Sequence, residues 1–155
     1  MQKFVRLFIL ACGITAASVS WAQSVTASQQ LAFGSFAAGS GGTVTLSAAG
    51  VRSAGGGVML VSSGSGSAAS FSVTGTPNAT YSITLPANGV VSLTSGANTM
   101  AVDNFTSNPS ASTASTGLLS AGGSQTLSVG ATLSVGSNQA SGSYSGSFNV
   151  TVNYP

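Results

Sequence analysis

The sequence predicts an all-β protein: a single-domain, antiparallel β-sandwich of the immunoglobulin-like kind. Apolar residues alternate with Ser and Thr in many short runs, which is typical of strands with one buried face. Clusters of Gly, Asn and Pro separate these runs about every ten residues, the spacing of turns in antiparallel sandwiches and barrels. After the first 22 residues, no stretch carries the apolar stripe of an amphipathic helix.

Residues 1–22 have the layout of a secretory signal peptide. Two basic residues precede the apolar run Leu7–Ala17, and the small residues Ser20 and Ala22 stand at positions minus 3 and minus 1 of a cleavage site. The run is too short to span a bilayer permanently, so no transmembrane segment is expected after cleavage. We therefore expect an exported protein, in the periplasm, at the cell surface or outside the cell, whose single domain is residues 23–155.

Cleavage leaves a domain almost without charge. Arg52 and Asp103 are its charged side chains, and its formal net charge is zero. Cys12 suggests a lipid-attachment site, but that site would truncate the apolar run, so we interpret Cys12 as part of the leader and expect no disulfide. A net charge near zero favours association between molecules and gives no support for a nucleic-acid partner.

The residue inventory also argues against catalysis. The chain has no His, no Glu and a single Asp. A pair of carboxylates, a Ser-His-Asp triad and a Cys-His pair therefore cannot be assembled. One Asp is a poor basis for a metal site. We expect no enzyme, no cofactor and no metal.

Alternating apolar residues predict the central strands in order along the chain. The predicted strands are Thr43–Ser47, Ser70–Thr74, Thr80–Leu85, Met100–Val102 and Leu127–Val135. Gly130 lies within the last of these and indicates a bulge or a bend. The continuous apolar run Val58–Val61 predicts a strand covered on both faces. Among the predicted turns are Gly39–Gly42, Gly55–Gly57, Asn88–Gly89 and Gly136–Asn138.

The last segment, Ser141–Pro155, predicts a near-perfect amphipathic strand. One parity carries Tyr144, Gly146, Phe148, Val150, Val152 and Tyr154, and the other carries Ser, Thr and Asn. A strand with nothing after it cannot continue into a hairpin. Its far edge must be covered by an earlier part of the chain or by another molecule.

The segment after the leader is a second candidate for a partner contact. Val25, Ala27, Leu31 and Phe33 share one parity, which Gln29 interrupts. This pattern allows a strand donated to a neighbouring molecule. It equally allows the first strand of the chain's own domain, above all around Leu31 and Phe33.

The terminal strand resembles the C-terminal strand of chaperone-usher pilins, in which a glycine fourteenth from the end and a penultimate aromatic residue enclose alternating hydrophobics. Here these are Gly142 and Tyr154. The resemblance implies a pilin-like sandwich and, as partners, sister subunits, a periplasmic chaperone and an outer-membrane usher. The partner-binding residues would be Gly142, Tyr144, Phe148, Val150, Val152 and Tyr154. The chain departs from pilins in its short N-terminal segment, because pilin donor segments lie wholly outside their own domain.

A longer set of motifs is similar to the exported bacterial domain family numbered 4402. The motifs are Leu31–Gly34, Gly41–Thr45, Arg52–Ser53 before Gly55–Val58, Gly75–Pro86, Leu127–Leu133 and Tyr144–Tyr154. That family has no settled activity, so the resemblance implies a secreted, fimbria-like β-sandwich rather than a reaction. Because Arg52 falls within one of these motifs, a structural role for Arg52 is favoured more than the motif-free sequence would suggest, against the alternative of an exposed side chain without a role.

Two functional hypotheses follow. In the first, the protein is a secreted structural or adhesive subunit of the fimbrial type that self-associates by strand complementation. In the second, it is a self-contained, non-catalytic sandwich that binds a surface glycan or a protein through polar loops. A stable monomer in the absence of any chaperone would favour the second hypothesis.

Overall fold

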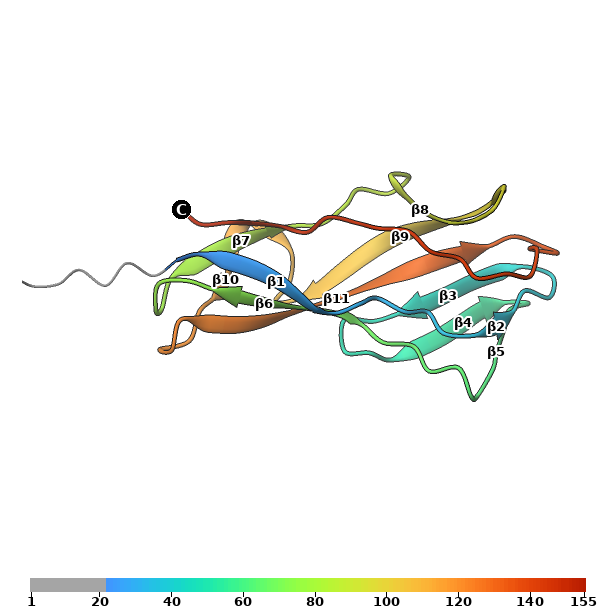
Figure 1. Ribbon diagram of the computed structural model, residues 1–155, viewed down its shortest axis with the longest axis horizontal. Helices are drawn as coiled ribbons and strands as arrows, with labels where there is room; N and C mark the ends of the chain where they lie inside the picture. Colours follow the sequence, from blue (N-terminus) through green and yellow to red (C-terminus); the bar gives the residue numbers. More distant parts are fainter. Residues whose placement is uncertain (1–21) are drawn as a thin grey trace, which may run out of the picture.

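Strands account for all the regular structure in the computed structural model, which describes residues 22–155 of an elongated molecule (Figure 1). The prediction of an all-β, antiparallel, single-domain fold is confirmed. Except for Ala22, the predicted signal peptide lies outside the described residues. The strands are β1 Ser24–Gln29, β2 Phe36–Ala37, β3 Gly42–Leu46, β4 Arg52–Gly56, β5 Met59–Leu60, β6 Ala69–Thr74, β7 Thr80–Thr84, β8 Val91–Ser95, β9 Asn98–Asn108, β10 Ser112–Leu118, β11 Ser124–Val135 and β12 Thr151–Asn153.

The long strand β11 organises the larger sheet. Along one edge its first half pairs with β6 and its second half with β3. Its other edge pairs with β9. Val129, for example, lies between Ala69 of β6 on one side and Ser107 of β9 on the other. The strand β1 extends the sheet from β6, β4 extends it from β3, and β8 extends it from β9. β11 therefore spans both halves of the elongated molecule.

A three-stranded sheet in the order β10-β7-β12 and the short pair β2-β5 complete the fold. Two apolar clusters form the core. Cluster A contains Phe33, Val44, Leu46, Val58, Val91, Met100, Val102, Ala131, Leu133 and Val135. Cluster B contains Ala69, Val73, Tyr81, Ile83, Leu119, Leu127 and Val129. The half-buried side chains of Leu31, Phe105 and Phe148 pack against both clusters.

The bulge expected at Gly130 is confirmed. The pairing of β11 with β9 shifts register between Gly130 and Thr132. A Cβ atom at Gly130 would overlap the carbonyl group of Leu46 and the backbone of Ser47. Glycine thus lets the end of β3 approach β11 at the point where β11 exchanges one neighbour for the other.

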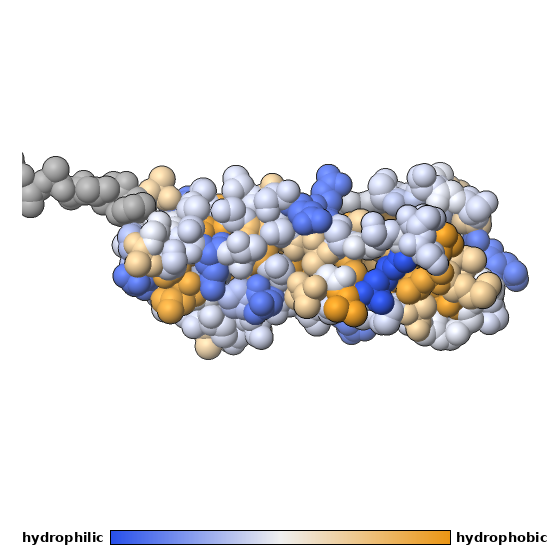
Figure 2. All heavy atoms as spheres, turned by 90° about the horizontal axis from the view of Figure 1, so that it is seen from below, coloured by the Kyte–Doolittle hydropathy of each residue, from blue (hydrophilic) through white to orange (hydrophobic). Residues whose placement is uncertain are grey.

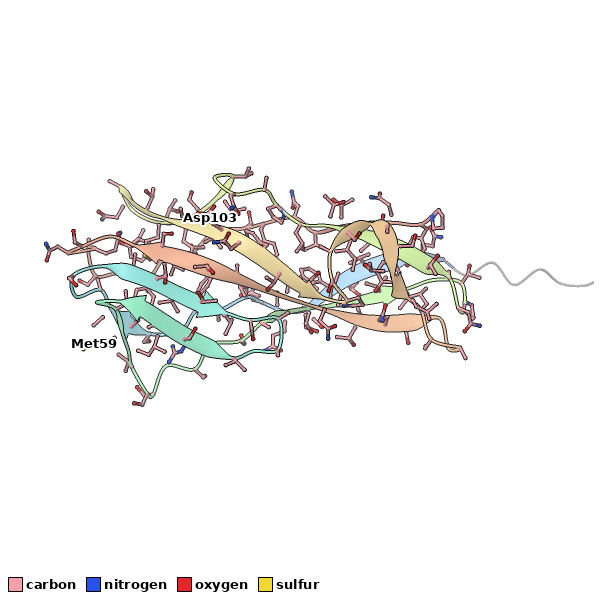
Figure 3. All side chains as sticks on the ribbon, turned by 180° about the vertical axis from the view of Figure 1, so that it is seen from behind. Met59 and Asp103 are labelled. Carbon is pink, nitrogen blue, oxygen red and sulfur yellow. The ribbon has the colours of Figure 1, made fainter. Side chains whose placement is uncertain are left out.

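The prediction for Val58–Val61 is wrong. Only Met59 and Leu60 form a strand, which pairs with β2 alone. The side chains of Met59 and Val61 are 65% and 41% exposed. Figure 3 shows Met59 at the margin of the molecule. A continuous apolar run therefore does not mark a strand buried on both faces here.

Some strands carry little signal in the sequence. Gly55 and Gly56, expected in a turn, lie in β4 opposite Thr43 and Gly42. The strand β10 has no alternation of large apolar side chains, yet it pairs with β7.

On the face shown in Figure 2, apolar residues form separate patches among hydrophilic ones.

Candidate functional site

The terminal segment forms a strand only in part, which corrects the prediction of a continuous strand. At its end, β12 pairs with β7, with Val152 opposite Ile83. Farther upstream, Ser145 exchanges two backbone hydrogen bonds with Thr94 of β8, of 2.8 and 3.0 Å. Between these two points, residues 146–150 belong to no strand. The segment runs along the upper side of the molecule in Figure 1 and is attached to both sheets.

Its predicted alternation is confirmed by burial. The half-buried residues are Tyr144, Phe148, Val150, Val152 and Tyr154, and the residues between them are exposed, as are Gly142 and Gly146. The ring of Phe148 lies 5.1 Å from that of Phe105 and 6.3 Å from that of Phe71, centroid to centroid. The apolar face of the segment therefore packs on the chain's own core, yet none of its side chains is fully buried.

Tyr154 closes one end of the molecule. Its ring centroid lies 5.8 Å from that of Tyr81, and its hydroxyl donates a hydrogen bond to the carbonyl of Thr74 on β6 (3.1 Å). The Tyr81 hydroxyl donates to Oε1 of Gln125 (2.6 Å). Burial, with a smaller contribution from Tyr154, raises the pKa of Tyr81 to about 12. Burial also raises the pKa of Tyr154.

Hydrogen bonds also fix the upstream end of the terminal segment. Tyr144 donates its hydroxyl to the carbonyl of Ala140 (2.7 Å). Nε2 of Gln139 donates to the Tyr144 hydroxyl (2.9 Å) and to the carbonyl of Thr99 (3.3 Å). Tyr144 and Tyr154 thus hold the two ends of the segment, and the stretch around Gly146 lies between these attachments.

The N-terminal residues divide into two groups. Val25 and Ala27 lie in β1, at the edge of the larger sheet opposite Val73 and Phe71, and every residue of β1 is exposed. Phe33 is only 6% exposed within cluster A, and Leu31 packs against both clusters. Leu31 and Phe33 therefore belong to the core of their own domain.

A groove of about 1200 Å³ separates the two terminal segments of the domain. One wall is formed by residues 27–38 and the other by residues 139–148. The floor consists of apolar side chains from four strands of the larger sheet: Ala69, Phe71, Val91, Leu93, Met100, Val102 and Leu133. No sequence pattern predicted this groove, because its two walls lie at opposite ends of the chain.

The two charged side chains bind backbone groups rather than each other. Nη1 of Arg52 donates to the carbonyls of Phe33 (3.0 Å) and Ser35 (3.3 Å), and Nη2 donates to the carbonyl of Val61 (3.0 Å). Arg52 thus ties one wall of the groove to the residues after β5. Oδ1 of Asp103 accepts a hydrogen bond from the backbone N–H of Gly89 (2.7 Å).

Within residues 22–155, no three His, Cys, Asp or Glu side chains come together as metal ligands would. In the same residues, no helix is long and apolar enough to span a membrane.

A family comparison covers almost the whole described part of the chain. No curated protein and no solved structure matches it. Residues 24–154 match the model of a family described as a domain of unknown function, DUF4402. These residues include both walls of the groove and the terminal strand. The chain therefore belongs to the DUF4402 family.

Proposed function

We propose that the protein is a secreted, non-catalytic structural subunit of the fimbrial type that assembles by strand complementation. In this assembly, an extended strand from a second subunit fills the groove between residues 27–38 and residues 139–148. The groove itself is the observation that carries the proposal, because apolar side chains, among them those of the half-buried Phe71 and Leu93, line it.

The chemistry of the groove suits a β-strand. An incoming strand would bond through its main chain and place alternate side chains on the apolar floor. Each apolar side chain that it buries would contribute about 1.5 to 3 kcal/mol. The charged side chains of residues 22–155 are Arg52 and Asp103, and both are bonded to backbone groups. The contact between two subunits would therefore depend on main-chain hydrogen bonds and on the burial of apolar side chains.

The donor in this proposal is the segment Gln23–Gln30. Its strand β1 has no charge, is exposed at every residue, and is held by pairing with β6. The donor set is narrower than the sequence alone predicted. Val25 and Ala27 remain in it, whereas Leu31 and Phe33 anchor the chain to its own core. A periplasmic chaperone and an outer-membrane usher fit this proposal as partners that cover the groove before assembly.

The competing proposal is a self-contained monomer that binds a glycan or a protein. The pairing of β1 with its own β6 favours it, because that edge of the sheet is already occupied. Size-exclusion chromatography of protein purified without a chaperone separates the two proposals. A protein that stays monomeric at all concentrations supports the proposal of a self-contained monomer. Polymers that form as the concentration rises support assembly by strand complementation.

A charge placed in the groove tests complementation directly. Leu93 is half-buried and lines the groove, so Leu93→Glu should abolish polymers because an incoming strand cannot pair with a buried carboxylate. Leu118→Glu is the matched control, since Leu118 is 55% exposed and does not line the groove. Light scattering should show polymers for the control and none for Leu93→Glu. Equal polymerisation of two folded variants would contradict the groove as the assembly site.

Deletion of Gln23–Gln30 tests the donor separately. The shortened protein should stay folded but monomeric, because it loses the donor and keeps Leu31 and Phe33, which pack on its own core. Long fibres formed by the shortened protein would show that another segment is the donor.

A further inference from the structure

The loop of residues 85–90, which joins β7 to β8, holds the single Asn-Gly pair of the sequence, Asn88–Gly89. Neighbouring residues of β9 bind both members of this pair. The backbone N–H of Gly89 donates to Oδ1 of Asp103 (2.7 Å). The backbone N–H of Asn104 donates to Oδ1 of Asn88 (2.8 Å), and Nδ2 of Asn88 donates to Oδ1 of Asn104 (3.2 Å). Figure 3 shows Asp103 on β9.

An Asn-Gly pair has an intrinsic reaction of its own. The backbone nitrogen of Gly89 attacks Cγ of Asn88, so that an N–Cγ bond forms and the Cγ–Nδ2 bond breaks. The proton of the Gly89 nitrogen passes through solvent to the leaving amide, which departs as ammonia. Water then opens the resulting succinimide ring to aspartate or isoaspartate. Glycine at the second position favours the attack, because no side chain hinders its nitrogen.

We propose that Asn88–Gly89 is a deamidation site and that Asp103 is the positioning residue that keeps it unreactive. The carboxylate holds the Gly89 nitrogen by a charge-assisted hydrogen bond. It also opposes loss of the proton from that nitrogen, because an amide anion would form in contact with a second negative charge.

The side-chain amide of Asn88, the other reacting group, is also held by hydrogen bonds. Asn104 binds both the oxygen and the nitrogen of the Asn88 side-chain amide, so Cγ cannot rotate onto the Gly89 nitrogen until two hydrogen bonds break. Deamidation would convert the neutral amide of Asn88 into a carboxylate at the same site as Asp103. The like charges would repel, and the loop would separate from β9.

The test follows isoaspartate at residue 88 by peptide mapping and mass spectrometry. In the folded wild-type protein this product should form far more slowly than in the same protein unfolded in urea. Asp103→Ala should raise the rate in the folded state by roughly ten-fold, the factor that corresponds to loss of one charge-assisted hydrogen bond. Asp103→Asn, which keeps an acceptor oxygen but not the charge, should give an intermediate rate.

Asn98→Ala is the matched control. It removes a hydrogen bond to the carbonyl of Ser95 at the other end of the β8–β9 hairpin and should leave the rate unchanged. Equal rates in folded and unfolded wild-type protein would overturn the proposal even if Asp103→Ala failed to fold. A slower reaction in folded Asp103→Ala than in the wild type would also overturn it, because Asp103 would then be promoting the reaction.

Discussion

At the scale of single residues, hydrogen bonds of polar side chains attach segments that lie apart in the sequence. Arg52 ties three backbone carbonyls together at one wall of the groove, and Gln125 accepts hydrogen bonds from the Tyr81 hydroxyl and from the backbone of Leu118. Within the described residues, no buried side-chain nitrogen or oxygen lacks a partner. The contacts of Arg52 and Gln125 thus hold one segment of the chain against another.

Gly130 is the residue at which a minimal change should have a large effect. We expect Gly130→Ala to lower the free energy of unfolding by about 3 kcal/mol, because the new methyl group overlaps the backbone of Leu46 and Ser47. Gly122→Ala is the control, since its Cβ would lie 3.6 Å from the nearest atom, Oγ of Ser120. Urea unfolding of both variants measures the difference. Similar losses in the two variants would contradict the close approach at Gly130.

Because the pKa of Tyr81 is raised, we expect the protein to become less stable at high pH. The pKa of Tyr81 is raised in the folded protein from its ordinary value of 10.0 to about 12. The unfolded chain therefore loses this proton first, so the contribution to stability is complete below pH 10 and is lost as the pH rises toward about 12. Urea unfolding across this range should show the fall, and Tyr81→Phe should weaken it. A stability that is flat to pH 12 would contradict the prediction.

At the scale of elements, the terminal segment is attached at its two ends and loosely held between them. β12 pairs with β7, Ser145 pairs with Thr94, and residues 146–150 belong to no strand. Hydrogen exchange should therefore be faster in residues 146–150 than in β12 or at Ser145. This middle stretch partly coincides with the wall of the groove, the place where a strand from another subunit would have to be accommodated.

The attachment of β12 should depend on the last tyrosine. Tyr154→Phe removes the hydrogen bond to the carbonyl of Thr74, a loss of about 1 kcal/mol. Amide exchange in β12 should then become roughly five-fold faster. Tyr144→Phe is the control, because the Tyr144 hydroxyl binds at the opposite end of the segment. If both variants change β12 equally, Tyr154 has no local role there.

At the scale of the whole molecule, β11 contributes buried side chains to both apolar clusters. Leu127 and Val129 lie in cluster B, and Ala131, Leu133 and Val135 lie in cluster A. Because one strand contributes to both clusters, neither half of the elongated domain can lose its packing without disturbing the other.

This arrangement predicts a single cooperative unfolding transition. Leu127→Ala and Leu133→Ala should each lower the free energy of unfolding by about 2–5 kcal/mol, since both side chains are fully buried. Calorimetry and near-ultraviolet circular dichroism should give coincident transitions for both variants. Two separate transitions, or loss of structure confined to one cluster, would show that the halves unfold independently.

Much of the fold could be predicted because its strands are amphipathic. Around Val44, Val73, Ile83 and Val102, single alternating runs indicated both the strand and its buried face, and the structure confirms them. The pattern of residues does not predict β10, because it lacks alternating large apolar side chains and is held by pairing with β7. The prediction for Val58–Val61 is wrong because an apolar run does not indicate whether a second layer covers the strand.

The sequence by itself determined the all-β class, the alternation of the terminal strand and the near absence of charge, because each follows from local residue types. Only the tertiary structure decided where the groove lies, which N-terminal residues belong to the core, and that Asp103 reaches Gly89. These features bring together segments that are far apart in the chain. Chain reversals and strand pairing set such distances, and no local pattern encodes them.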